Sequence, residues 1–221
     1  MDFLTGVQRL HSETGRSTAA PTSVVGQTGR ILRLVNAYAD AWIELQSEHD
    51  WRWMRGTTDA PLTIGVQKYS GTDLGVASRF GRWRHEDDSY WPRTYVAGSP
   101  NSLWNLQFQG LDNFRDQWVY IQQGSSSPVC WTIDENENIL LGPAPAVAYM
   151  IRADYLKEPF ALVLDVDTPD LPDRFQNILV WRALMDVSKS GAAPEVLARA
   201  EQNYRDLHDK LLFDQARLPM L

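Results

Sequence analysis

The chain has 221 residues, which is enough for one large domain or two small ones, and a hydrophobic content of 43% that supports a normal core. Its net charge of −7 comes from the middle: residues 57–170 hold 15 acidic and 8 basic side chains, whereas the segments before and after are neutral. This distribution argues against a general nucleic-acid-binding protein, which needs a net positive surface.

The cysteine count and the hydropathy pattern address the compartment. Cys130 is the single cysteine, so a disulfide within the chain is excluded. It lies in an apolar stretch beside Trp131, which is typical of an inert buried thiol. No apolar run approaches the length of about 18 residues that spans a bilayer, and Asp2 stands where a signal peptide carries basic residues. We expect a protein made in a cytoplasm, without a membrane partner.

Two helices are expected in the first quarter of the chain. Asp2 is a suitable N-cap for a short helix that ends near Gly15, and a Ser, Thr, Gly and Pro-rich loop follows over residues 17–27. Residues 28–54 then predict a helix of about 27 residues, roughly 40 Å long at 1.5 Å per residue. Its apolar and aromatic positions recur at steps of three and four: Ile31, Leu34, Val35, Tyr38, Trp42 and Leu45.

From residue 57 the pattern changes to short β-branched or aromatic runs bounded by Gly, Pro, Asn and Ser, which predict strands. A hairpin is expected because the acidic and amide run 134–138 separates two of these strands. Residues 103–116 are ambiguous between strand and helix. The predicted strands are Leu62–Ile64, Trp118–Gln122, Val129–Ile133, Ile139–Leu141 and Tyr149–Tyr155.

Helical spacing returns at Pro172, where an almost wholly apolar helix is expected to lie buried and to end at Gly191. Pro194 opens a last helix with one apolar face and one charged face. The predicted fold class is therefore α+β. Helices from the N-terminal (1–56) and C-terminal (171–221) segments form one bundle, and residues 57–170 form a β-rich insertion.

A search for reactive groups yields no candidate catalytic, metal or cofactor site. The four histidines (11, 49, 85 and 208) stand far apart, and none has a second histidine at ligand spacing. The runs 134–138 and 165–169 begin like calcium loops, but Ile139 replaces the required glycine and the second run fails at its fifth position. They are interpreted as a hairpin turn and a Pro-bounded loop. No nucleophile elbow or phosphate loop is present, so we expect no enzymatic activity.

One segment has binding character, because arginines alternate with aromatic residues between positions 79 and 93. Such residues stack on bases and hold phosphates, or they form cation–π and carboxylate contacts with their own loop or a neighbouring subunit. The acidic surroundings favour the second interpretation. We name as candidate subunit-interface residues Arg82, Trp83, Arg84, Trp91 and Arg93.

The segment from residue 139 to 175 carries a family resemblance. Its parts are Ile139–Pro145, then Tyr149–Tyr155 with Pro159, then Asp165–Pro172 with Phe175. With the N-terminal helices and the Asp50–Trp53 run, these patterns resemble the head-to-tail adaptor (neck) proteins of tailed bacteriophages. The resemblance is weakest over residues 72–117, and no catalytic residue travels with it.

The resemblance implies a virion structural protein that is assembled in the host cytoplasm and located at the head–tail interface. It implies a ring of twelve copies between the portal protein and a tail or nozzle protein, extending the channel through which double-stranded DNA passes. The C-terminal segment would dock into the portal through Phe213, Leu218, Pro219, Met220 and Leu221.

A second hypothesis is a carbohydrate- or surface-binding module of a phage tail. Tryptophan rings serve as sugar platforms as well as core and interface residues, and five of the nine tryptophans lie in the insertion. Loss of sugar binding on replacing Trp83 or Trp91 would support this module over the adaptor.

Overall fold

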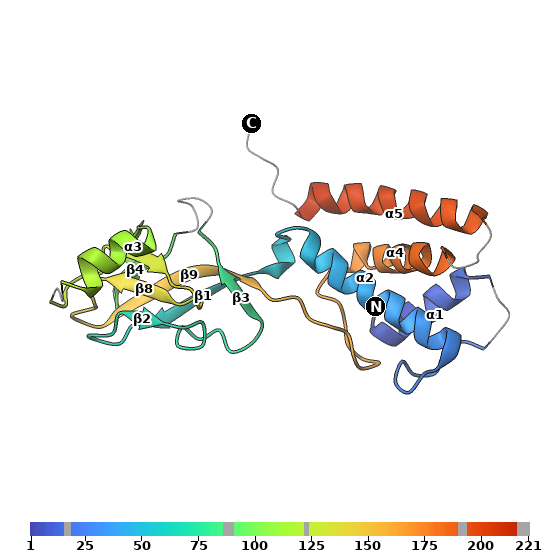
Figure 1. The fold of residues 1–221 in the computed structure, drawn as a ribbon, viewed down its shortest axis with the longest axis horizontal. Coiled ribbons are helices and arrows are strands. Elements are labelled where there is room, and N and C mark those ends of the chain that lie inside the picture. Colours follow the sequence, from blue (N-terminus) through green and yellow to red (C-terminus); the bar gives the residue numbers. More distant parts are fainter. Residues whose placement is uncertain (16–18, 86–90, 122–123, 190–193, 216–221) are drawn as a thin grey trace. The chain divides into compact units, whose positions relative to one another are not determined.

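A computed structural model describes the chain except for residues 16–18, 86–90, 122–123, 190–193 and 216–221. The fold is α+β, with helices at both ends of the chain and strands between them (Figure 1). Two compact units are present: a helical unit of residues Met1–Met54 and Pro159–Leu221, and a β unit of residues Arg55–Glu158. Within the described residues, no helix is both long and apolar enough to cross a membrane.

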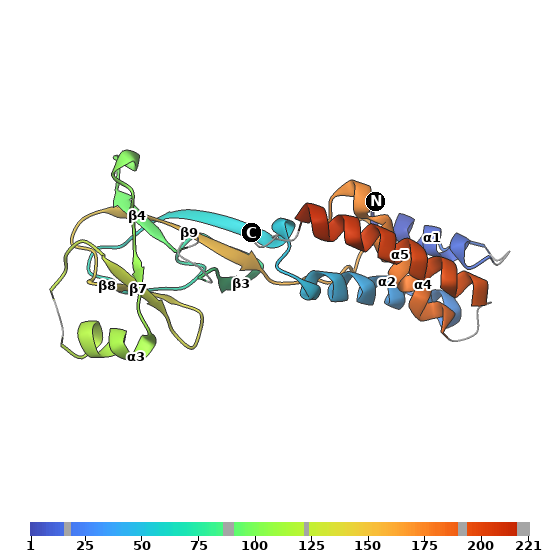
Figure 2. The same cartoon turned by 90° about the horizontal axis from the view of Figure 1, so that it is seen from above.

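The helical unit contains α1 (Phe3–Glu13), α2 (Gly29–Glu48), α4 (Asn177–Ser188) and α5 (Pro194–Gln215). As expected, Asp2 caps α1, accepting a hydrogen bond of 2.8 Å from the Thr5 backbone N–H. Helix α4 lies between α5 and the α1–α2 pair, and Figure 2 shows the same bundle from above. The expectation of a buried α4 is confirmed by Ile178, Leu179, Val180, Ala183 and Leu184.

The expected helix over residues 28–54 is too long, because α2 ends at Glu48. His49 is extended, and the chain folds back through a short 3₁₀ turn, η1 (Arg52–Met54). The fully buried Trp51 explains the stop: its indole N–H donates to the carbonyl of Leu45 in the last turn of α2, where no helical N–H remains to pair with it.

The β unit contains two sheets. One has the order β1–β9–β4–β5, with β3 also paired to β9: β1 (Arg55–Pro61), β3 (Phe80–Trp83), β4 (Arg93–Val96), β5 (Trp104–Asn105) and β9 (Tyr149–Lys157). The other has the order β2–β8–β7–β6: β2 (Lys68–Tyr69), β6 (Gln107–Phe108), β7 (Cys130–Ile133) and β8 (Ile139–Gly142). Side chains from both sheets form one core around Trp83, Trp131 and Ile151.

Three sequence expectations for the β unit are confirmed. Strands β7 and β8 form an antiparallel hairpin in which Ile133 pairs with Ile139. Strand β9 alternates as predicted, with Tyr149, Ile151 and Ala153 buried. Cys130 is buried, and burial raises the pKa of its thiol to about 11.

Two predicted strands are wrong. Leu62–Ile64 follows the true strand, β1, which ends at Pro61. In place of the strand at Trp118, helix α3 (Leu111–Phe114) continues into a π-helical turn, η4 (Arg115–Val119). The ambiguous residues 103–116 hold β5, β6 and the start of this helical segment. The predicted helix end at Gly191 and the hydrophobic tail 218–221 lie outside the described residues.

Candidate assembly surfaces

The loop that precedes α4 has an unusual arrangement of polar and apolar side chains. Asp165 binds the neighbouring loop between α1 and α2: it accepts hydrogen bonds from the Val24 N–H at 2.6 Å and from the Ser23 hydroxyl at 3.2 Å. Asp167 accepts from the Val163 and Leu164 N–H groups, both at 2.7 Å, and these bonds lower the pKa of Asp167. The loop predicted from the run 165–169 is therefore confirmed, with its acidic groups used by the protein itself.

Because the polar groups of this loop point at its own backbone and at the neighbouring loop, its apolar side chains are left outside. Val166 is 76% exposed, and Val163, Leu164 and Val25 of the neighbouring loop are each exposed over more than half of their surface. Figure 1 shows the two loops on the side of the helical unit away from α5. We call these four exposed side chains the valine patch: Val25, Val163, Leu164 and Val166. Clustered exposed apolar residues mark contact surfaces more often than scattered ones do.

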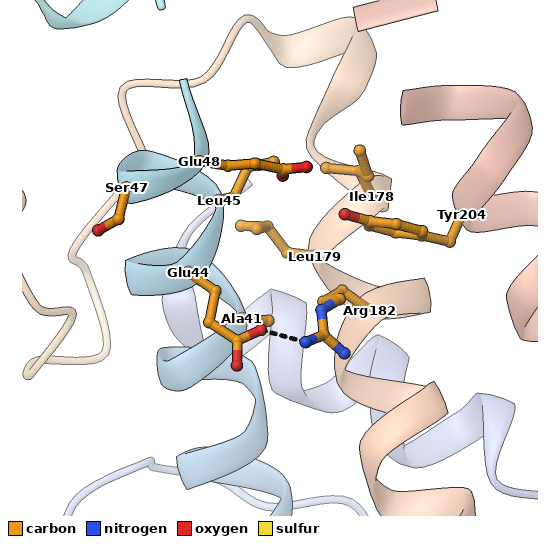
Figure 3. A pocket seen from close by; sticks show the side chains of 9 residues that line it. All are labelled: Ala41, Glu44, Leu45, Ser47, Glu48, Ile178, Leu179, Arg182 and Tyr204. Atoms are coloured by element: carbon orange, nitrogen blue, oxygen red, sulfur yellow. Dashed lines mark ion pairs between the residues drawn. The ribbon is translucent and has the colours of Figure 1, made fainter. Parts of the chain in front are cut away.

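A groove of about 440 Å³ lies between α2, α4 and α5 (Figure 3). Its floor is apolar, with Leu45, Ile178 and Leu179, and an ion pair between Glu44 and Arg182 crosses it. A smaller hollow of about 280 Å³ continues along α2 and α4, sharing Glu44 and Arg182 with the first. Among the residues that line it, the groove holds no pairing of a nucleophile with a base. Its apolar floor can accommodate an apolar side chain.

Tyr204 of α5 closes one wall of the groove. Burial, followed by the nearby charge of Glu48, raises the pKa of its phenol to about 12. The neutral hydroxyl offers a donor and an acceptor at the rim.

The predicted interface residues of the β unit are divided by the structure. Trp83 is fully buried in the core of its own unit, with its indole N–H donating to the Glu137 carbonyl at 2.9 Å, and Arg84 is also buried. Trp91 is half-buried against the same core. Arg82 is exposed on β3, and Arg93 is half-buried on β4.

Arg82 and Arg93 belong to two strands, β3 and β4, that pair along the same edge of β9. β3 pairs with β9 around Leu156 and β4 pairs with it around Ile151, while β1 occupies the opposite edge along its whole length. The contribution of these two arginines to an interface remains a prediction. Of the predicted portal-docking residues, Phe213 is described and is 75% exposed; the other four, Leu218 to Leu221, lie outside the described residues.

Sequence reasoning missed the valine patch and the groove. A signal for the patch was present, since a run of Val, Leu and Val occurs inside a loop bounded by Asp and Pro, where core-forming residues are not expected. The groove had no such signal, because α2 is separated from α4 and α5 by more than a hundred residues of the sequence.

The helical unit thus carries an exposed apolar patch and a groove with an apolar floor, features that are typical of contact surfaces. The sequence matches the SU10 adaptor protein family over residues 5–219. The chain belongs to this family and is therefore a structural adaptor protein of a bacteriophage, a component of the virion. A search of curated proteins returned no match.

Proposed function

We propose that the protein is a head-to-tail adaptor that forms a ring, of twelve copies, between the portal and the tail and extends the DNA channel. The observation that carries this proposal is the family match, which covers both units of the chain. The surfaces of the helical unit support it, since a closed ring needs two different patches that meet on successive copies.

In this proposal the valine patch of one copy packs into the α2–α4 groove of the next. The patch offers short branched side chains, which lose little conformational entropy when an interface forms. The groove offers an apolar floor between Leu45 and Leu179 and an ion pair that keeps the surface soluble before assembly. A patch and a groove are different surfaces, which is the requirement for a heterologous contact.

Phe213 and the residues after it form the proposed contact with the portal. Phe213, in the last turns of α5, is exposed and does not pack in the core, whereas Leu211 nearby is buried. Exposed aromatic anchors are enriched among residues that dominate binding energy. The acidic β unit is proposed to face the tail or the channel, where its negative charge would repel the phosphates of DNA and prevent tight binding.

The test is a chain shortened by residues 215–221. We expect it to fold with an unchanged circular dichroism spectrum, to form rings with itself, and to fail to join portal-containing heads in a sedimentation assay. Attachment of the shortened chain at the level of the full chain would contradict the docking proposal, while loss of rings as well would place the tail in the ring interface instead.

The carbohydrate-binding alternative has lost one of its two named platforms, because Trp83 is buried. No observation on the described residues favours it over assembly.

A further inference from the structure

Three potential metal ligands meet where α2 ends. They are Glu48, the last residue of α2, the following His49, and His208 of α5. One ligand atom from each lies within 4.8 Å of the others. The Oε1 atom of Glu48 is 3.0 Å from Nε2 of His208 and 3.9 Å from Nε2 of His49. The bundle creates this cluster, since the two histidines lie near opposite ends of the chain.

The orientation of His208 distinguishes the cluster from an ordinary ion pair. Its Nε2 atom is shielded from solvent and, within the described part of the chain, makes no hydrogen bond of acceptable geometry, although Glu48 lies at contact distance. The Glu48 oxygen and the His208 nitrogen are thus close together without forming a well-directed hydrogen bond. This arrangement fits two ligand atoms that coordinate the same metal ion. In a tetrahedral zinc site with bonds of about 2.0–2.1 Å, the ligand atoms are separated by about 3.3 Å.

Aromatic packing orients both imidazole rings. Tyr204 stacks on His208 with ring centroids 5.3 Å apart, and the ring of Trp51 is perpendicular to both histidines, at 5.0 Å from His49 and 6.4 Å from His208. Trp51 is itself fully buried and bonded to the Leu45 carbonyl. The two imidazole rings are thus positioned by their aromatic neighbours, which lowers the entropy cost of binding an ion.

Helix α5 packs on α4 and is also held by the ion pairs Arg199–Glu13 and Asp214–Arg174. Of its 22 residues, only Ala200 and Leu211 are fully buried. His208 lies between Ala200 and Leu211. Coordination of a metal ion by His208, Glu48 and His49 would join α5 directly to the end of α2. Such a link would add stability where apolar packing is thin.

We propose that Glu48, His49 and His208 bind one divalent transition-metal ion of the zinc class, which clamps α5 to the end of α2. Two imidazoles and one carboxylate suit Zn²⁺, Co²⁺ and Ni²⁺, whereas Mg²⁺ and Ca²⁺ prefer ligand sets made of oxygen. Three protein ligands leave the fourth position of a tetrahedral ion to water. The metal site adjoins the groove between α2, α4 and α5, because Glu48 lines the groove and Tyr204 both lines it and stacks on His208. The proposed metal site rests on no observation of the ring or the portal contact.

The test uses the full chain without a polyhistidine tag, stripped with a chelator and titrated calorimetrically with ZnCl₂. We expect one ion per chain, and a visible absorption band of a four- or five-coordinate ion on titration with CoCl₂. His208→Gln and Glu48→Gln should each weaken zinc binding by at least about tenfold, the lower range for loss of even an outer partner of a metal site. The matched control, His85→Gln, removes a histidine of the β unit and should bind as the original chain does.

A second readout separates binding from folding. Zinc at a hundredfold excess over its Kd should raise the melting temperature of the helical unit by about 10 °C and slow amide exchange in α5. Without metal, the variants and the original chain should share one circular dichroism spectrum. Zinc binding that is absent, that persists in His208→Gln, or that falls equally in His85→Gln would overturn the proposal.

Discussion

At position 6 the absence of a side chain allows α1 to rest on the ring of Tyr38. A Cβ atom at this position would overlap the phenol ring, and Tyr38 is held in turn by stacking on Phe3 at 5.7 Å. We expect Gly6→Ala to destabilise the helical unit by about 1–3 kcal/mol, the usual cost of overpacking. Chemical denaturation followed by circular dichroism measures this change.

Gly124→Ala is the control for this substitution, because a Cβ at that position meets no atom within 4 Å. Equal stability of the Gly6 variant and the original chain would show that the close approach of α1 to Tyr38 is wrong.

Asp134 organises the turn of the β7–β8 hairpin. Burial alone would raise its pKa, but the ion pair with Lys68 at 2.7 Å and hydrogen bonds from Asn136 and Asn138 outweigh burial and lower it. A lowered folded pKa means stability that is present above the unfolded pKa of about 3.9 and is lost as pH falls toward the folded value.

We expect Asp134→Asn to destabilise the β unit by about 1–3 kcal/mol at pH 7, the cost of unpaired buried groups. Its unfolding free energy should also change less between pH 4 and pH 2 than that of the original chain. Asp116→Asn, an exposed position on η4, serves as the control. If the unfolding free energy of the Asp134 variant depends on pH as that of the original chain does, Asp134 does not stabilise the hairpin through its lowered pKa.

At the scale of elements, α5 is the helix most open to perturbation. Leu211 is one of its two buried residues, so Leu211→Ala should cost about 2–5 kcal/mol and detach the end of the helix. Hydrogen exchange should then show faster exchange in α5 than in α4. Phe213→Ala, two residues away and exposed, should leave exchange unchanged; protection that is lost equally in both variants would contradict the packing described here.

The elements that could be predicted from the sequence are those in which the spacing of apolar residues within the element itself specifies a helix or a strand. Helices α1 and α4, the β7–β8 hairpin and strand β9 follow from period and turn chemistry alone. The end of α2 could not be predicted, because Trp51 and Trp53 continue the helical pattern while their rings stack on each other at 4.7 Å outside the helix. Strand β1 was missed because its sequence is mostly polar, and its pairing with β9 is the reason it is extended.

The candidate site shows the same limit. An arginine and tryptophan run suggested an exposed binding surface, yet burial is decided by the sheet, and Trp83 faces the core. The ligands Glu48 and His208 come together only through the bundle. The valine patch was the exception, since apolar residues in a loop between Asp and Pro were visible in the sequence.

At the scale of the whole molecule, the proposed ring contact can be tested by charge. Val163→Glu with Val166→Glu places two carboxylates in the valine patch, where burial against a neighbour would be costly. Native mass spectrometry should find single chains with an unchanged circular dichroism spectrum. Val147→Glu, an exposed valine of the β unit, should still assemble, and rings formed by the patch variant would exclude this surface from the contact.

Every part of the proposed function leads to one position in the virion. The most direct measurement is electron cryomicroscopy of DNA-filled heads, isolated before tail attachment and mixed with the purified protein. The account predicts a ring of twelve copies beneath the portal, with the valine patch of each copy against the groove of its neighbour. Heads that acquire no density at the portal, or that carry the protein elsewhere on the capsid, would contradict it.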